Sequence, residues 1–276
     1  MPLEPAARAT IITGDAVRTL ASIDDATCAL TLFSPPYDKV RDYEDHPTYD
    51  SRTLGDELLR VTMDGGICAV VIGDGTEKFA KSLTSFRLAV DWCDRVGWRL
   101  FECCIYQRDG RPGAWWSKRF RVDHEYLLFF LKGARPRYFD KTHLTIPTKH
   151  AGAVWHGTQR HTDGTLTKIG PKAVSATKCR GTIWPYATSN SEGNKEKMRH
   201  PATFPDKLAD DVIRCFSRPG DLVLDPMCGS GTTLAMALRA GRSAIGIEIA
   251  EDYATLARER IAREQGGSVL DNTLVA

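Results

Sequence analysis

The amino-acid sequence predicts an α/β fold built around an open, mostly parallel sheet. Two apolar runs, 28–33 and 67–72, are short, uninterrupted and followed by chain breakers, as is typical of buried parallel strands. Toward the C-terminus, residues 222–248 alternate strand, glycine turn, helix and strand, which is the pattern of a βαβ unit. In such sheets the active site lies at the carboxyl ends of the strands.

The other elements follow from hydrophobic periodicity and turn residues. Further strands are predicted at 9–12 and 244–248, and an antiparallel pair at one edge of the sheet is predicted from 98–106 and 124–131. Helices are predicted at 16–22, 54–63, 79–96, 206–217 and 251–264. A further helix is predicted after the glycine turn; it ends at Ala240, with Gly241 as its C-cap.

The composition is that of an ordinary globular protein, with 42% hydrophobic and 26% charged residues in a chain of 276. This length suits one large domain or two small ones. No apolar stretch reaches membrane-spanning length, and residues 1–10 lack the apolar segment of a signal peptide, so we expect a cytoplasmic protein. The eight cysteines form no C-x2-C pair and have no histidine at metal spacing, which predicts reduced core residues and no metal.

The run Ser34-Pro35-Pro36-Tyr37 directly follows the strand at 28–33. Two consecutive prolines cannot continue a ladder, so the backbone is expected to form a stiff loop with unused carbonyl groups. With the Ser34 hydroxyl and the Tyr37 ring, such a loop suits a flat ring that carries an amino group. Ser-Pro-Pro turns also occur in purely structural roles, so this motif alone does not decide the function.

A second motif lies far downstream, in the run Asp225-Pro226-Met227-Cys228-Gly229-Ser230-Gly231-Thr232. A strand that ends in Asp225, a Gly-x-Gly turn, a helix and a strand that ends in Glu248 together predict a nucleoside-cofactor site. The run is not a phosphate-binding P-loop, because no Gly-Lys-Ser/Thr follows. Asp15, just past the first strand, could also accept hydrogen bonds from a nucleoside, although Gly-Asp begins many plain turns.

Basic residues gather in the middle of the chain. Residues 132–200 hold eight Lys and five Arg against two Asp and two Glu, a net charge of +9, whereas the remainder of the chain carries −7. This asymmetry predicts a surface that binds a polyanion. The preceding loop interleaves cations and rings, as nucleic-acid contacts do, at Arg108, Arg111, Trp115, Trp116, Lys118 and Arg119. A tryptophan pair that caps the core would explain the two rings equally well.

Together, the SPPY loop and the downstream DPMCGSGTT run resemble the β arrangement of the amino-methylating DNA methyltransferases of bacterial restriction-modification systems. The resemblance covers nearly the whole chain except the basic middle. It implies a Rossmann-like S-adenosylmethionine-dependent methyltransferase sheet in circularly permuted form. It also implies three parts: a catalytic part at 1–132, a target recognition insert at 133–199 and a cofactor-binding part at 200–276.

The resemblance further implies roles for individual residues. The cofactor S-adenosylmethionine would contact the downstream run. Its ribose would bind Glu248 and its adenine would lie near Asp15. Its methionine part would lie beside Thr203, Phe204 and Pro205. Met227 stands where the family usually has Phe. Tyr37 would stack on a base flipped out of double-stranded DNA, while Ser34 and the Pro35 carbonyl would accept hydrogen bonds from its amino group.

Ser34 favours cytosine N4 as the methylated atom, because SPPY usually accompanies that activity and DPPY accompanies adenine N6. Adenine N6 is the alternative, and an RNA methyltransferase or a non-catalytic DNA-binding module are more distant ones. RNA and protein-glutamine methyltransferases generally place the cofactor motif before the x-P-P-Tyr loop, whereas here the order is reversed. The resemblance allows a homodimer and a cognate restriction endonuclease as further partners, in a bacterial or phage setting.

Overall fold

The computed structural model describes residues 7–36, 50–108, 118–187 and 204–266. The chain divides into two compact units. The large unit comprises Met1–Asp140 and Thr182–Ala276, and the small unit comprises Lys141–Gly181.

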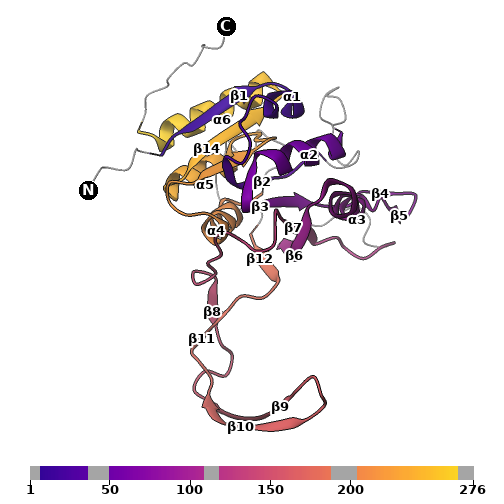
Figure 1. Cartoon of the computed structure of the whole chain (residues 1–276), viewed down its shortest axis with the longest axis vertical. Helices are drawn as coiled ribbons and strands as arrows, with labels where there is room; N and C mark the ends of the chain where they lie inside the picture. The colour runs from indigo at the N-terminus through magenta and orange to yellow at the C-terminus, as the bar shows by residue number, and fades with distance from the viewer. Residues whose placement is uncertain (1–6, 37–49, 109–117, 188–203, 267–276) are drawn as a thin grey trace. The chain divides into compact units, whose positions relative to one another are not determined.

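The large unit is built on one eight-stranded sheet with the order β1-β14-β13-β2-β3-β7-β6-β12 (Figure 1). Only β7 runs antiparallel to its neighbours, so the predicted parallel sheet is confirmed. The strands are β1 (Ala9–Thr13), β2 (Cys28–Phe33), β3 (Thr62–Ile72), β6 (Arg99–Arg108), β7 (His124–Leu131), β12 (Ile183–Tyr186), β13 (Leu222–Asp225) and β14 (Ser243–Glu248).

Six α-helices lie in the described part of the large unit. They are α1 (Ala16–Leu20), α2 (Ser51–Val61), α3 (Thr84–Asp91), α4 (Asp206–Phe216), α5 (Thr232–Arg239) and α6 (Glu251–Glu264). Aspartates begin two of them, because a carboxylate can accept from the unpaired N–H groups of a first turn. Asp15 accepts from the Arg18 amide at the start of α1, and Asp50 accepts from the amides of Arg52 and Thr53 at the start of α2.

The order of the strands is a circular permutation of a Rossmann-like sheet. The C-terminal βαβ unit, β13-α5-β14, lies next to the first strand of the chain, β1. The two strands pair in parallel from Ala9↔Ala244 to Thr13↔Glu248. This half of the sheet is therefore assembled from both ends of the sequence, as the predicted circular permutation requires.

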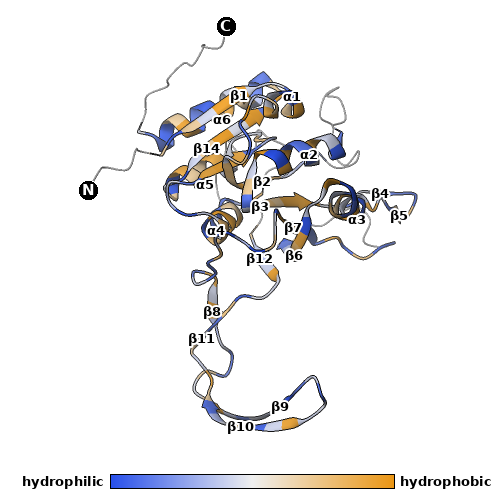
Figure 2. Ribbon diagram, viewed as in Figure 1, coloured by the Kyte–Doolittle hydropathy of each residue, from blue (hydrophilic) through white to orange (hydrophobic). Residues whose placement is uncertain are grey.

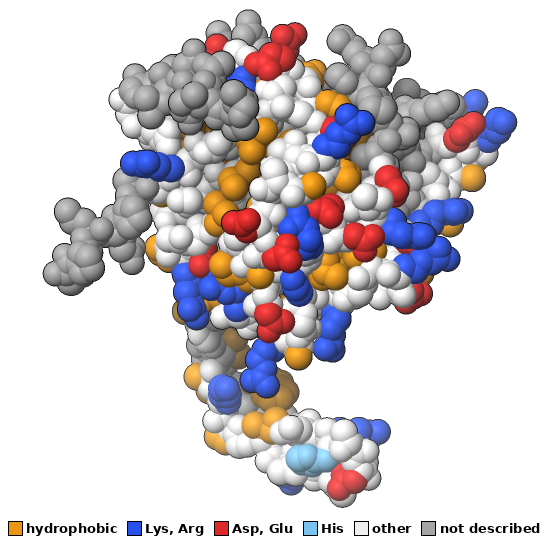
Figure 3. Space-filling model, turned by 45° about the horizontal axis from the view of Figure 1, so that its top comes forward, with side chains coloured by type: hydrophobic (Ala, Val, Ile, Leu, Met, Phe, Trp, Pro, Cys, Tyr) orange, Lys and Arg blue, Asp and Glu red, His pale blue; other side chains and the backbone are white. Residues whose placement is uncertain are grey.

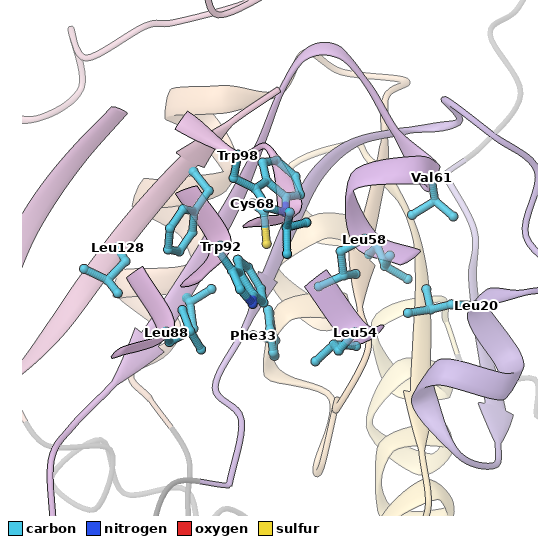
Figure 4. Close-up of a cluster of buried hydrophobic side chains, with 14 of the residues drawn as sticks. Leu20, Phe33, Leu54, Leu58, Val61, Cys68, Leu88, Trp92, Trp98 and Leu128 are labelled. Carbon is cyan, nitrogen blue, oxygen red and sulfur yellow. The ribbon is translucent and has the colours of Figure 1, made fainter. Parts of the chain in front are cut away.

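Aromatic and aliphatic side chains fill the space between the sheet and α2 (Figure 4). The Trp92 ring lies 4.9 Å from Phe130 and 6.1 Å from Trp98, centroid to centroid. Both indole N–H groups are satisfied by α2, since Trp92 donates to the Ser51 carbonyl and Trp98 to that of Gly55. Figure 2 shows the same core as hydrophobic colour along the central strands.

The region before α3 differs from the predicted helix at 79–96. Residues 76–81 form a small hairpin, β4 (Thr76–Glu77) with β5 (Ala80–Lys81), and α3 begins only at Thr84. Lys78, Phe79 and Leu83 all have positive φ angles, which no helix interior accepts. A π-helical turn over Trp92–Val96 then ends the segment.

The pair β6 and β7 is antiparallel, as predicted, but it is not at the edge of the sheet. β7 lies between β3 and β6, and β12 covers β6 on the outer side. Residues 133–199 therefore contain a strand of the large sheet. Within that stretch the sequence showed only isolated apolar residues, because β12 has four residues and alternates exposed and buried positions.

The small unit holds two antiparallel strand pairs. β8 (Thr145–Pro147) pairs with β11 (Thr177–Cys179), and β9 (Val154–Arg160) pairs with β10 (Leu166–Ala173). The second pair is a two-stranded ribbon exposed on both faces.

The eight cysteines are all free, and five of them are buried. No helix in the described ranges combines the length and the apolarity needed to cross a membrane.

Candidate active site at the carboxyl edge of the sheet

Four predicted site residues lie at the carboxyl ends of four neighbouring parallel strands. Asp15 comes after β1, Glu248 ends β14, Asp225 ends β13 and Ser34 follows β2. Because these strands are adjacent and parallel, their carboxyl ends share one edge of the sheet. The structure thus brings together residues that lie more than 200 positions apart in the sequence.

The loop 226–231, which we call the cofactor loop, is held by hydrogen bonds that its backbone amides donate. The Met227 amide donates to Asp225 Oδ1 over 3.1 Å, the Cys228 amide to the Ile247 carbonyl over 2.8 Å, and the Gly231 amide to the Cys228 carbonyl over 2.8 Å. Cys228 is buried, so its side chain packs in the core. Burial raises the pKa of the Cys228 thiol well above its ordinary value, which makes it unreactive.

Glycine is required at Gly231, where α5 begins. Its φ of +77° lies in the left-handed region, and a Cβ there would meet the Cβ of Ala257 on α6 at 3.1 Å. On β14, a Cβ at Gly246 would lie 2.7 Å from Leu234 and 2.9 Å from the Cys228 sulfur. Both glycines let the cofactor loop and the helices pack closely at this edge.

Glu248 fixes the cofactor loop and still has capacity for a ligand. Its side chain is 8% exposed, Oε2 accepts from the Gly229 amide over 2.8 Å, and Oε1 accepts from the Ala250 amide over 3.0 Å. A carboxylate offers about four lone-pair positions, so about two remain for other donors. A pair of ribose hydroxyls is a donor set of this size.

Ser230 provides an independent sign that a polar ligand belongs here. The side chain is 6% exposed, and its Oγ is buried without a hydrogen-bond partner among the described residues. Buried polar atoms in folded proteins are nearly always satisfied, so an orphan in the cofactor loop indicates a partner supplied from outside the chain. The residues present therefore fit a nucleoside cofactor with a polar tail.

Asp225 is buried beneath the loop, with 3% exposure. Burial raises its pKa to about 7, and the charge of nearby Glu248 acts in the same direction, against hydrogen bonds from Thr233 and the Met227 amide. Near neutral pH a large share of the molecules therefore carries a protonated Asp225.

Thr233 connects the cofactor loop to the strand before the SPPY motif. Its buried hydroxyl donates to the Leu32 carbonyl over 3.1 Å and also hydrogen-bonds Asp225. Thr233 was not among the predicted site residues, although the second threonine of the GTT run was the available signal.

Ser34 and Pro35 follow this anchored strand. Ser34 is partly exposed and Pro35 is buried, while Pro36 is partly exposed and Tyr37 lies outside the described residues. The β2 strand itself is buried at all six positions. A fixed strand that ends in an accessible serine is what a positioned hydrogen-bond acceptor needs.

The remaining predicted cofactor residues have additional, structural partners. Asp15 caps α1 through the Arg18 amide over 2.9 Å, and the neighbouring Gly14 amide donates to the Glu248 carbonyl over 2.9 Å. The hydroxyl of Thr232 accepts from Arg260 on α6 over 3.0 Å. Phe204 and Pro205 are buried at the start of α4, whereas Thr203 lies outside the described residues. Met227 packs against the main core.

The predicted DNA contacts are only partly described. Arg108 forms an ion pair with Glu125 on the neighbouring strand over 2.9 Å, so its charge is partly compensated within the protein. Lys118 is exposed and Arg119 is partly exposed. Arg111, Trp115 and Trp116 lie outside the described residues.

Arg260 is a second residue that sequence reasoning missed. It is 8% exposed on α6 and donates to the Thr232 hydroxyl and, over 2.7 Å, to Asp206 at the start of α4. It thereby joins α6 to α5, which follows the cofactor loop, and to α4. Its position in a polar helix of ordinary pattern gave no signal of this role.

Replacing Asp225 with asparagine should stabilise the cofactor-free protein as the pH rises. The folded-state pKa of about 7 exceeds the ordinary 3.8, so between those values the folded state binds more protons than the unfolded state and stability falls with rising pH. Asparagine imitates the protonated acid and removes this loss. We expect the variant's advantage in free energy of unfolding to grow by about 1.4 kcal/mol per pH unit, to about 4 kcal/mol at pH 8.

Urea unfolding from pH 5 to pH 8 measures this advantage, with Asp252→Asn on the exposed start of α6 as the control. An advantage that is equal at pH 5 and pH 8 would show that Asp225 is charged throughout.

Replacing Thr233 with valine should remove its hydrogen bonds to the Leu32 carbonyl and to buried Asp225, at a cost of about 1–3 kcal/mol in stability. Thr233→Ser keeps the hydroxyl and should restore most of the loss. We also expect the valine variant to lower kcat at saturating cofactor, because the strand before Ser34 loses its anchor. Serine and valine variants that are equally impaired would assign the effect to packing of the methyl group instead.

An open parallel sheet with a glycine loop and two acidic strand ends at its carboxyl edge defines a Rossmann-like enzyme that uses a nucleoside cofactor. The family model N6_N4_Mtase, described as DNA methylase, matches residues 28–259, and the chain belongs to this family. It is therefore an amino-methylating DNA methylase, as the two motifs predicted.

Individual relatives span nearly the whole chain. The orphan methyltransferase M.BamHII of Bacillus amyloliquefaciens is 33% identical over 250 residues, which cover 87% of this chain and 91% of that protein. The structure of the PvuII DNA methyltransferase (cytosine-N4-specific) superposes with a TM-score of 0.69 at 22% identity, covering 98% of this chain and 89% of the other. A DNA modification methylase of Thermus thermophilus, complexed with S-adenosyl-L-methionine, gives a TM-score of 0.62 at 25% identity, covering 96% and 98%.

Proposed function

We propose that this protein transfers a methyl group from S-adenosylmethionine to the exocyclic N4 of a cytosine flipped out of double-stranded DNA. S-adenosylmethionine is the cofactor of the family. The observation that carries the proposal is the placement of Ser34 just after β2 and of Asp225 at the end of its parallel neighbour β13. Thr233 connects the two strands, because its hydroxyl contacts both the Leu32 carbonyl and Asp225. The amino acceptor and the methyl donor would thus meet at one edge of the sheet.

The chain's own residues hold the cofactor at three points. Glu248 would accept hydrogen bonds from the ribose hydroxyls, and the cofactor loop with its unpartnered Ser230 would contact the methionine part. Asp15, beside Glu248 across the β1–β14 pair, would face the adenine with the oxygen that α1 leaves free. The bound cofactor supplies a methyl group on a positively charged sulfur, which leaves as a neutral thioether.

The residues of the SPPY loop would orient the base. Ser34 Oγ and the Pro35 carbonyl accept hydrogen bonds from the amino group, which localises the nitrogen lone pair for attack on the methyl carbon. The nitrogen then releases a proton to solvent. Because the nitrogen attacks the methyl carbon directly, no covalent bond to the protein is needed. Tyr37 would stack on the base, which must leave the duplex for its amino nitrogen to be reached.

Serine at position 34 supports cytosine over adenine. The PvuII DNA methyltransferase, which has the same fold, is named as cytosine-N4-specific, in agreement with this choice. Adenine N6 remains the alternative, because the family model covers both amino groups. The basic stretch 133–199, including the small unit, would recognise the target sequence.

Mass spectrometry of nucleosides separates the two bases. Duplex DNA is incubated with the protein and S-adenosylmethionine that carries an isotope-labelled methyl group, then digested. We expect label in N4-methylcytosine. Label in N6-methyladenine would overturn the base assignment. In a parallel reaction with RNA, label in the RNA but none in the DNA would overturn the proposed substrate.

A further inference from the structure

The small unit carries the most one-sided charge of the described chain. Among its 41 residues, Lys141–Gly181, five Lys and two Arg stand against one Asp, a net charge of +6. Four of the seven histidines of the protein also lie in this unit. Figure 3 shows scattered lysine and arginine side chains and a histidine on this part, among uncoloured, hydrophobic and a little acidic surface. Such a surface fits the phosphates of a nucleic acid.

The β9–β10 ribbon of this unit has two different faces. Cross-strand partners share a face, and successive residues alternate. Trp155 and Gly157 lie on one face with their partners Lys172 and Ile169, and we call this the closed face. The opposite face, which we call the open face, carries His156, Thr158 and Arg160 together with Leu166 and Lys168.

The closed face is covered by its own tryptophan. A Cβ at Gly157 would lie only 1.8–2.4 Å from carbons of the Trp155 ring, so the indole lies directly over the glycine. Gly157 and its partner Ile169 are the two least exposed residues of the ribbon. On the same face, the Thr167 hydroxyl is engaged by His161 over 2.8 Å. This face is therefore partly covered by its own side chains, while Trp155 itself stays 52% exposed.

The open face presents side chains of the types that can hydrogen-bond base edges. Arg160 and Lys168 are exposed, and no described residue forms an ion pair or a side-chain hydrogen bond with either of them. Arginine and lysine are the commonest partners of guanine in the major groove, and a two-stranded ribbon has the width of that groove. The bulge at Gly170 and Pro171 interrupts the pairing beyond Lys168 and leaves the ladder regular where these residues lie.

We propose that the β9–β10 ribbon enters the major groove of the target DNA with its open face toward the bases, so that Arg160 and Lys168 determine sequence specificity. This inference rests on the proposed function and assigns its recognition step to one face of one ribbon. The closed face then lies away from the bases, and Trp155 keeps the ribbon stiff.

The chain offers a matched control, because Lys168 and Lys172 lie on the same strand, are both exposed and differ in face. We compare Arg160→Gln, Lys168→Gln and Lys172→Gln in the full-length protein. The target sequence is first located by sequencing methylated DNA, and kcat/KM is then measured on that duplex and on duplexes with one altered base pair.

We expect Arg160→Gln and Lys168→Gln to lower kcat/KM on the target about 10- to 100-fold and to reduce discrimination against an altered guanine pair. Lys172→Gln should change kcat/KM less than about threefold and leave discrimination intact. A Lys172→Gln effect as large as that of Lys168→Gln would overturn the assignment of the face, while wild-type methylation would still uphold the proposed function. Wild-type protein that methylates no DNA would instead overturn both.

Discussion

Replacing Glu248 with glutamine is expected to weaken S-adenosylmethionine binding by about 100-fold or more. The two carboxylate oxygens each accept a backbone N–H, one from Gly229 in the cofactor loop and one from Ala250. An amide has one acceptor, so one of these donors would face an NH2 group in a site that is 8% exposed. An unsatisfied buried donor costs about 1–3 kcal/mol, and lost charge-assisted bonds to the ribose add to this.

Isothermal titration calorimetry with S-adenosylmethionine measures this effect, because about 2.7 kcal/mol corresponds to a 100-fold change in Kd. Glu259→Gln removes the same charge from an exposed position of α6 and should leave Kd within about twofold. Wild-type affinity in the Glu248 variant would show that the cofactor binds elsewhere.

Replacing Ser34 with alanine should lower the rate of methyl transfer by about 100-fold while leaving cofactor affinity unchanged. Ser34 follows β2 and lies outside the cofactor loop, so in the proposed mechanism its hydroxyl would act on the base and not on the methyl donor. Loss of one positioned hydrogen bond that strengthens in the transition state typically costs about this much in rate. Because Ser34 is partly exposed, we expect little change in folding stability.

Single-turnover methyl transfer with enzyme in excess over duplex DNA isolates the chemical step. Ser22→Ala, at an exposed serine beyond α1, serves as the control. A Ser34→Ala protein as active as the wild type would refute the proposed role of the SPPY loop.

The fold was largely predictable because its central strands are short apolar runs bounded by breakers. β2 was predicted at its observed bounds, and so was α6. The early start assigned to α3 was wrong because hydropathy does not report the positive φ of Leu83. The β9–β10 ribbon gave no periodic signal, since a ribbon exposed on both faces has no apolar side.

The candidate site could be predicted where its residues belong to a short sequence motif. The strand ends at Asp225, Glu248 and Ser34 were found in this way, and the sheet order brings them to one edge. The contact between Thr233 and Leu32 spans 201 positions in the sequence, so only the assembled sheet reveals it. The same holds for Arg260, whose partners lie on two other helices.

Hydrogen–deuterium exchange with and without S-adenosylmethionine tests the central claim most directly, since it reports backbone protection along the whole chain. We expect the cofactor to slow exchange in peptides that cover 225–231 and 246–250, at the carboxyl ends of β13 and β14, and to leave 141–181 unchanged. Unchanged exchange in the first two segments, with protection at another place, would contradict a cofactor site at this edge of the sheet.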